Sequence, residues 1–168
     1  MAIPKKVINY LEKAKVKYKV IEHRTVYTAF DKSKTLKVKE NIVGKTLVLK
    51  ADKELIMVLV PANKNLDRNK LKKVINVWKK KSGQKLIKKI EFASERLIKN
   101  KIKGVRIGST PPFGNMFKIP TFINKSLLSL PEIIVNSGHY NCSIKIKGDI
   151  LKKLVPDLVV GSFAKTRK

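Results

Sequence analysis

Two adjacent apolar, β-branched runs constrain the fold of this 168-residue chain more than any other feature. Residues 46–50 and 55–60 both have the composition of a strand, and the short polar segment Ala51–Glu54 between them has that of a turn. Pro61 cannot donate a backbone hydrogen bond, so it ends the second run. Together the two runs predict a β-hairpin.

Apolar spacing elsewhere predicts a mixture of helices and short strands. Helical periodicity occurs over residues 7–14 and 66–78, and the second of these has a lysine-rich outer face. Shorter helical segments are expected over 94–100 and 149–155, and strands over 18–22, 90–92, 122–123, 132–136 and 143–147. This pattern predicts a single α/β domain over residues 1–168, with a mixed, partly barrel-like sheet flanked by helices and a loose basic tail over 161–168.

The chain is strongly basic. It has 39 Lys and Arg residues against 12 Asp and Glu, giving a formal net charge of +27 and an isoelectric point near 10.3. Such a charge attracts polyanions, of which nucleic acid is the usual one. The lysines are dispersed and arginines are few, which favours contact with the phosphate backbone over base-specific recognition.

Several classes of protein do not fit the sequence. A single cysteine, Cys142, excludes an internal disulfide and suits a reducing compartment. The longest apolar run is too short to span a bilayer, and residues 1–6 have no apolar signal core. We therefore expect a cytoplasmic protein with no membrane partner.

The segment Gly108–Gly114, Gly-Ser-Thr-Pro-Pro-Phe-Gly, predicts a rigid loop. Peptide N–H groups in such a loop can hold a phosphate or an oxyanion without side chains. The alternative is that the glycines and prolines only separate strands, as such clusters usually do.

Other catalytic or metal-binding patterns are weak. His23, His139 and Cys142 are too few for a metal site, so neither metal nor cofactor is expected. Residues 44–46, Gly-Lys-Thr, lack the upstream glycine of a nucleotide-binding P-loop. A base–nucleophile pair of His139 and Cys142 lacks an orienting acid.

Four motifs, in order, resemble the YbaK/prolyl-tRNA synthetase-associated domain family of aminoacyl-tRNA deacylases. The resemblance covers roughly residues 3–155, nearly the whole chain. Its motifs are Glu22–Ala29 (EHRTVYTA), Val43–Leu49 (VGKTLVL), Gly108–Gly114 (GSTPPFG) followed by Ile119-Pro120, and Val135–His139 (VNSGH) followed by Ser143-Ile144.

The resemblance implies a mixed sheet flanked by helices and trans-editing, the hydrolysis of mischarged aminoacyl-tRNA. The implied partners are the aminoacylated 3′ end of tRNA and, as a further candidate, an aminoacyl-tRNA synthetase. Lys45 aligns with the family's functional lysine, and Gly108 and Pro112 fit its G-x-x-x-P loop. Expected catalytic residues are Lys45, Gly108, Pro112, Gly114 and His139, and expected substrate-binding residues are His23, Tyr27, Thr28, Ser109, Thr110, Phe113 and Gly138.

In the expected mechanism the protein contributes modestly to hydrolysis, because an aminoacyl ester is already activated toward attack by water. Backbone N–H groups of the loop would stabilise the oxyanion, and Lys45 would hold a phosphate or the carbonyl oxygen. The substrate's own ribose hydroxyl would help to deliver the proton. We expect Lys45, the loop and the Gly138–His139 turn to line one cleft, with the Lys45 ammonium inside it. His139 is either a pocket residue or a structural turn residue. The alternative function is a non-catalytic tRNA- or RNA-binding module.

Overall fold

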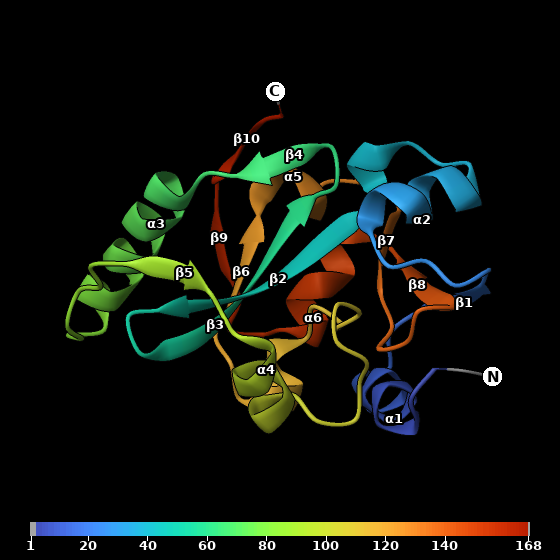
Figure 1. Ribbon diagram of the computed structural model, residues 1–168, viewed down its shortest axis with the longest axis horizontal. Helices are drawn as coiled ribbons and strands as arrows, with labels where there is room; N and C mark the ends of the chain where they lie inside the picture. Colours follow the sequence, from blue (N-terminus) through green and yellow to red (C-terminus); the bar gives the residue numbers. More distant parts are fainter. Residues whose placement is uncertain (1–2, 168) are drawn as a thin grey trace.

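The predicted hairpin forms the centre of a five-stranded mixed sheet (Figure 1). The computed structural model describes residues 3–167. Strand β2 (Gly44–Ala51) pairs antiparallel with β3 (Glu54–Pro61), and the turn between them places Asp52 in the left-handed region. The sheet order is β5-β2-β3-β6-β9, in which β5 (Ile90–Phe92) is antiparallel to β2 whereas β6 (Thr121–Asn124) and β9 (Val159–Gly161) run parallel to β3.

A three-stranded antiparallel sheet lies beside the hairpin. It has the order β1-β8-β7, formed by Lys19–Glu22, Cys142–Ile146 and Ile133–Asn136. One parallel bridge between Val43 and Ile134 links it to the start of β2. A separate two-stranded ribbon pairs β4 (Lys64–Leu66) with β10 (Ala164–Thr166). The described strands leave these sheets open, so the α/β prediction is confirmed while its barrel-like element is not seen.

Helices cover both sheets. Helix α1 (Lys5–Ala14) buries Val7 and Leu11 against β7 and β8, and α3 (Arg68–Lys81) buries Leu71 and Ile75 against the central sheet. The remaining helical segments are α2 (Ala29–Leu36), α4 (Glu95–Lys101), α5 (Lys125–Leu128), α6 (Leu151–Leu154) and the 3₁₀ turns η1 (Glu40–Ile42), η2 (Gly114–Phe117) and η3 (Gly148–Ile150). No helix within residues 3–167 is long and apolar enough to cross a membrane.

The C-terminal segment corrects one prediction. We expected a loose tail from Gly161, but Phe163 is fully buried and its N–H donates to Asn124 Oδ1 at 3.0 Å. Residues 164–166 then form β10 against β4. Burial of an aromatic ring and a strand pairing outweigh the basic composition of this segment. Lys168 lies outside the described residues.

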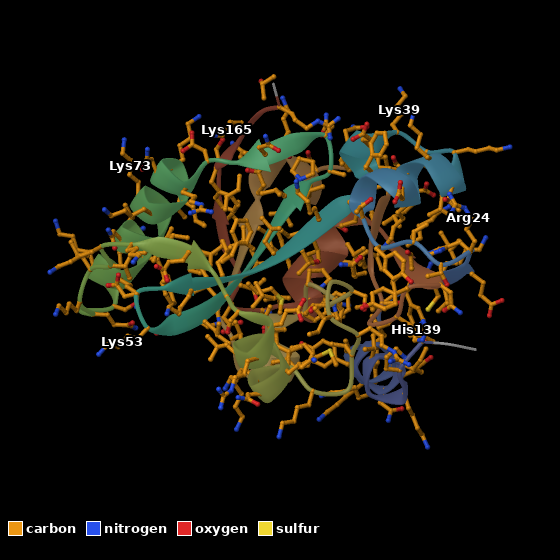
Figure 2. All side chains as sticks on the ribbon, in the orientation of Figure 1. Arg24, Lys39, Lys53, Lys73, His139 and Lys165 are labelled. Atoms are coloured by element: carbon orange, nitrogen blue, oxygen red, sulfur yellow. The ribbon has the colours of Figure 1, made fainter. Side chains whose placement is uncertain are left out.

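The positive charge surrounds the molecule and is not confined to one face. The labelled side chains Arg24, Lys39, Lys53, Lys73 and Lys165 project from different parts of its outline (Figure 2). A dispersed field of this kind attracts a polyanion without selecting a single docking orientation.

Candidate functional site

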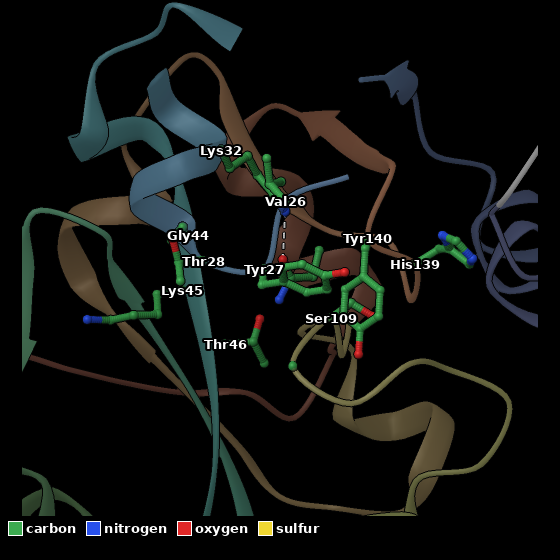
Figure 3. A pocket seen from close by; sticks show the side chains of 13 residues that line it. Val26, Tyr27, Thr28, Lys32, Gly44, Lys45, Thr46, Ser109, His139 and Tyr140 are labelled. Atoms are coloured by element: carbon green, nitrogen blue, oxygen red, sulfur yellow. Dashed lines mark hydrogen bonds between the residues drawn. The ribbon is translucent and has the colours of Figure 1, made fainter. Parts of the chain in front are cut away.

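Segments from four distant parts of the chain enclose one pocket of about 240 Å³ (Figure 3). They are the approach to α2 with its first turns, the start of β2, the Gly108–Ser109 turn and the segment that follows β7. The lining residues are Val26, Tyr27, Thr28, Ala29, Lys32, Gly44, Lys45, Thr46, Gly108, Ser109, Asn136, His139 and Tyr140. Six of the residues expected from the sequence are therefore brought together: Tyr27, Thr28, Lys45, Gly108, Ser109 and His139.

Hydrogen bonds fix the turn at Gly138 to the segment that enters the Gly/Pro loop. The Gly138 N–H donates to Ser109 O at 2.8 Å, and the Arg106 N–H donates to Gly138 O at 2.8 Å. Gly138 has a φ of +100°, and an added Cβ would lie 2.9 Å from both Pro4 Cγ and Val105 Cγ1. Gly138 therefore acts from behind the pocket, by holding two of its walls together.

The segment before α2 is held against the same turn. The Val26 N–H donates to Tyr140 O at 3.0 Å, drawn as a dashed line in Figure 3. The Tyr27 and Tyr140 rings meet edge to face with centroids 4.8 Å apart, and Tyr27 remains 69% exposed at the rim. Thr28 caps α2, because its Oγ1 accepts from the Asp31 N–H at 3.0 Å. Its hydroxyl is thus occupied in positioning the helix.

Only the beginning of the Gly/Pro loop reaches the pocket. Gly108 has a φ of +83°, and Ser109 closes the turn with its N–H and Oγ both donating to Arg106 O. The residues from Thr110 to Gly114 are buried in the interior. The Phe113 ring stacks on the Tyr10 ring, with the ring centroids 5.9 Å apart. The second half of the loop is therefore packed in the interior, and Thr110, Pro112, Phe113 and Gly114, which we expected to take part directly, do not line the pocket.

Gly114 illustrates why this part of the loop is buried. A Cβ added there would lie 2.3 Å from the carbonyl oxygen of Ile119, which is backbone and cannot move freely. The Ile119 N–H also donates to Gly114 O at 3.0 Å. Glycine is required at this position by close packing of two backbones.

Lys45 lines the pocket, but its ammonium points elsewhere. Side chains alternate along a strand, and Leu47 packs with the α3 core whereas Val48 packs with the α4 side. Lys45 shares the Leu47 face, and its Nζ donates to Lys64 O at 3.1 Å. In Figure 3 its side chain is directed away from Tyr27, Ser109 and Tyr140. The expectation of a Lys45 ammonium inside the cleft is therefore wrong for this conformation.

The charge environment of Lys45 lies outside the pocket. Burial, and secondly the nearby Arg167 guanidinium, lower the pKa of the Lys45 ammonium, although Glu40 opposes this. Glu40 is itself paired with Arg167 at 3.1 Å. Two cations and one carboxylate thus gather beside β4, and they leave an excess of positive charge there.

The two histidines take different positions. His139 lines the pocket, but its ring extends away from the Tyr27–Tyr140 pair (Figure 3), and its Nδ1 is buried without a hydrogen-bond partner among residues 3–167. His23 lies outside the lining, because its Nε2 is bonded to Ser143 Oγ at 2.9 Å and its Nδ1 to Arg24 O at 2.7 Å. Burial lowers the pKa of His23. His23 therefore tethers the segment before α2 to β8, and it does not line the pocket.

Lys32 is one of seven lining residues that the sequence analysis did not name as site residues, and it is the charged one among them. It lies in α2, is only 5% exposed, and donates from Nζ to Asn136 Oδ1 at 2.7 Å. Burial lowers the pKa of its ammonium to about 8. Ala29, Lys32, Ser33 and Leu36 share one helical face at i, i+3, i+4 and i+7 spacing. A lysine on the otherwise small or apolar face of this helix could have indicated a pocket residue. The sequence analysis predicts no helix over residues 29–36, so that face was not recognised.

Thr46 adds an unsatisfied polar group to the pocket. Its Oγ1 is buried and has no hydrogen-bond partner within the described part of the chain. An uncompensated buried hydroxyl is costly, so a bound ligand with a polar atom here would gain affinity. Among residues 3–167, no group of three or more His, Cys, Asp or Glu side chains is placed to hold a metal ion.

Comparison with known proteins identifies a family by sequence and finds solved structures with the same fold. Residues 23–154 match the family model of the aminoacyl-tRNA editing domain. No curated protein shows significant sequence similarity to the chain.

Solved structures share the fold at low identity. One is the hypothetical protein APE2540, with a TM-score of 0.77 and 18% identity over 96% of this chain and 100% of that one. Another is a protein proposed to be a trans-editing enzyme for prolyl-tRNA synthetase, with a TM-score of 0.76 and 21% identity over 96% of both chains. A third, proposed to act in signal transduction in Marinobacter aquaeolei VT8, has a TM-score of 0.68 and 14% identity over 97% of this chain and 31% of that one.

Proposed function

Because the chain belongs to the aminoacyl-tRNA editing domain family, we propose that it hydrolyses the ester bond of mischarged aminoacyl-tRNA. The observation that carries the proposal is the pocket itself. It gathers residues from all four motifs that resemble the deacylases, and it is small enough to enclose an aminoacyl group while the tRNA stays outside.

The pocket supports water attack on the ester carbonyl. Within residues 3–167 no hydrogen bond is found for the Gly108 N–H, so it is free to stabilise a developing oxyanion. Ser109 and the buried half of the loop hold this N–H in place. The neighbouring ribose hydroxyl of the substrate would deliver the proton, since no carboxylate from the described part of the chain lines the pocket. Pre-positioning of the water and ester supplies much of the remaining rate enhancement.

Lys45 has a role at the edge of the pocket in this proposal. Its ammonium, which points out of the pocket with Arg167 nearby, would meet a phosphate of the 3′ strand while the ester enters between Tyr27 and Ser109. A phosphate would offset the repulsion between the two cations. An aminoacyl-tRNA synthetase remains a candidate partner, in keeping with the description of one structural neighbour.

The test is release of amino acid from a panel of mischarged tRNAs, measured beside binding of the same tRNAs without their amino acid. Turnover well above spontaneous hydrolysis supports the deacylase. Binding without turnover for the entire panel contradicts it and favours the non-catalytic tRNA-binding module. A variant with Ser109 changed to proline removes the N–H that closes the Gly108 turn and is expected to lose turnover.

A further inference from the structure

Lys32 is a buried cation that has no carboxylate partner among the described residues, 3–167. Its Nζ has one hydrogen bond within residues 3–167, to the amide oxygen of Asn136, and it takes part in none of the ion pairs found there. A lysine ammonium has three donors, so two are left for other acceptors. The other titratable groups that face it are the Cys142 thiol and the His23 ring, and neither is a carboxylate.

The second buried lysine of the fold provides a contrast. Lys79 is 6% exposed, and its Nζ lies 3.7 Å from Glu54 Oε2 and 3.3 Å from Gln84 Oε1. It therefore has both a carboxylate and an amide as partners. Buried charges are normally paired in this way, because an unpaired one is costly. Lys32 has the amide partner but not the carboxylate, and it lies in the wall of a cavity.

We propose that Lys32 makes this pocket selective for aminoacyl esters whose side chain carries a carboxylate, as in an aspartyl ester. The inference rests on the proposed function, because it takes the aminoacyl group as the occupant of the pocket. The substrate carboxylate supplies the missing counter-charge to Lys32, while Asn136 holds the ammonium in place. A backbone phosphate is a poorer candidate, because Lys32 is almost completely withdrawn from the surface.

The same arrangement orients the substrate. Lys32 repels the α-ammonium group of the ester, so that group is directed away from Lys32 and toward the exposed rim of the pocket at Tyr27. The Tyr27 ring is in edge-to-face contact with Tyr140, and aromatic faces attract cations. The two charges of the aminoacyl group thus meet two chemically different walls, with the carbonyl carbon between them near Gly108.

The test compares aspartyl and asparaginyl esters on one tRNA, since the two side chains have nearly the same shape and differ in charge. We expect kcat/KM to be at least tenfold higher for the aspartyl ester. Lys32→Met should bring the ratio close to one, whereas Lys32→Arg should keep a preference for the aspartyl ester. Lys79→Met, the matched control, should leave the ratio unchanged. An equal or reversed ratio in the unaltered protein overturns the proposal without any variant.

A binding measurement separates this inference from the proposed function. Calorimetry with 3′-aspartylamino- and 3′-asparaginylamino-adenosine, whose amides are not hydrolysed, reports selectivity alone. Tighter binding of the aspartyl compound that disappears in Lys32→Met supports the selectivity even if no ester is hydrolysed. Hydrolysis of esters with no preference for the aspartyl side chain in either assay overturns the selectivity and leaves the deacylase intact.

Discussion

Lys45 and Thr46 are neighbours on β2, and their side chains lie on opposite faces of the strand. The Thr46 hydroxyl is buried beside the pocket and has no hydrogen-bond partner among residues 3–167, whereas the Lys45 ammonium donates to Lys64 O next to β4. The motif that contains both residues therefore serves two surfaces. One surface is the pocket lining, and the other is the side of β2 that faces β4.

We expect Lys45→Ala to lower kcat/KM for mischarged tRNA by about tenfold or more, mainly through KM, because under the proposed function it removes a charge that would meet phosphate outside the pocket. Stability should change little, since a half-buried lysine with one carbonyl partner contributes little. Lys53→Ala, in the exposed hairpin turn, is the control. Turnover in a folded Lys45→Ala protein that equals that of Lys53→Ala would remove Lys45 from the mechanism.

Binding of tRNA should weaken steeply as salt is added. The formal net charge of +27 is spread over the surface, so association should release several counterions from the phosphate backbone. Affinity measured across a salt series should give a straight line of negative slope on logarithmic axes. A nearly flat line would show that contacts other than phosphate charge carry the affinity.

The stability contribution of Lys32 should depend on pH. In the unfolded chain the ammonium keeps its proton up to a pKa of 10.5, whereas burial lowers its folded pKa to about 8. Between these values the unfolded state binds more protons, so stability rises with pH. The burial penalty is fully present below about pH 8 and is lost as pH approaches 10.5. The difference between the two pKa values corresponds to a burial penalty of about 3 kcal/mol in the free energy of unfolding, at 1.36 kcal/mol per pH unit.

The measurement is chemical denaturation of the unaltered protein and Lys32→Met from pH 7 to 10.5. The free energy of unfolding of the unaltered protein should rise relative to that of Lys32→Met across the upper part of this range. Cys142 and His23 are present in both proteins, so subtracting one curve from the other removes most of any contribution they make. A difference that stays constant with pH would contradict the buried, charged state of Lys32.

Gly138→Ala should lower the free energy of unfolding by about 1–3 kcal/mol, because φ is +100° and the new Cβ would press on Pro4 and Val105. Turnover should fall too, since the strain acts on the hydrogen bonds to Arg106 and Ser109. Gly83→Ala is a matched control, with a φ of +67° and nothing within 4 Å of the added Cβ. Equal losses in the two variants would show that only the backbone conformation matters at Gly138.

Phe163→Ala should destabilise the domain by about 3–5 kcal/mol, the usual loss when a buried aromatic ring is removed. Lys165→Ala, two residues further and exposed, should have almost no effect. Thermal melts of the two variants make the comparison. A mild effect of Phe163→Ala would indicate that the C-terminal segment is only loosely attached.

The sequence was sufficient to predict the elements whose structure depends on residues close together in the chain. Apolar β-branched runs and a polar turn predicted the hairpin, and helical periodicity predicted α1 and α3. The motifs also indicated which segments meet at the pocket. The hairpin and the two helices depend on residues near one another in the chain, and the meeting of the segments was predicted from the order of the motifs.

The sequence did not show which face of a strand or helix packs against the rest of the protein. The alternation along β2 shows that Lys45 and Thr46 diverge, but only the packing of Leu47 and Val48 shows which of the two faces the pocket. Likewise a lysine at position 32 looks solvated until α2 is placed against β7. The Gly/Pro loop was correctly seen as rigid, but most of it is rigid because it is buried.

The pairing of β1 with β8 determines when the pocket can form during synthesis. Lys19 lies opposite Lys145, so strands more than a hundred residues apart must meet before the segment leading to α2 is held beside the turn at Gly138. A nascent chain that has not yet emerged past residue 146 lacks this pairing. Pairing over such a separation forms slowly compared with local structure. The pocket is therefore complete only after residues as far as 146 have left the ribosome.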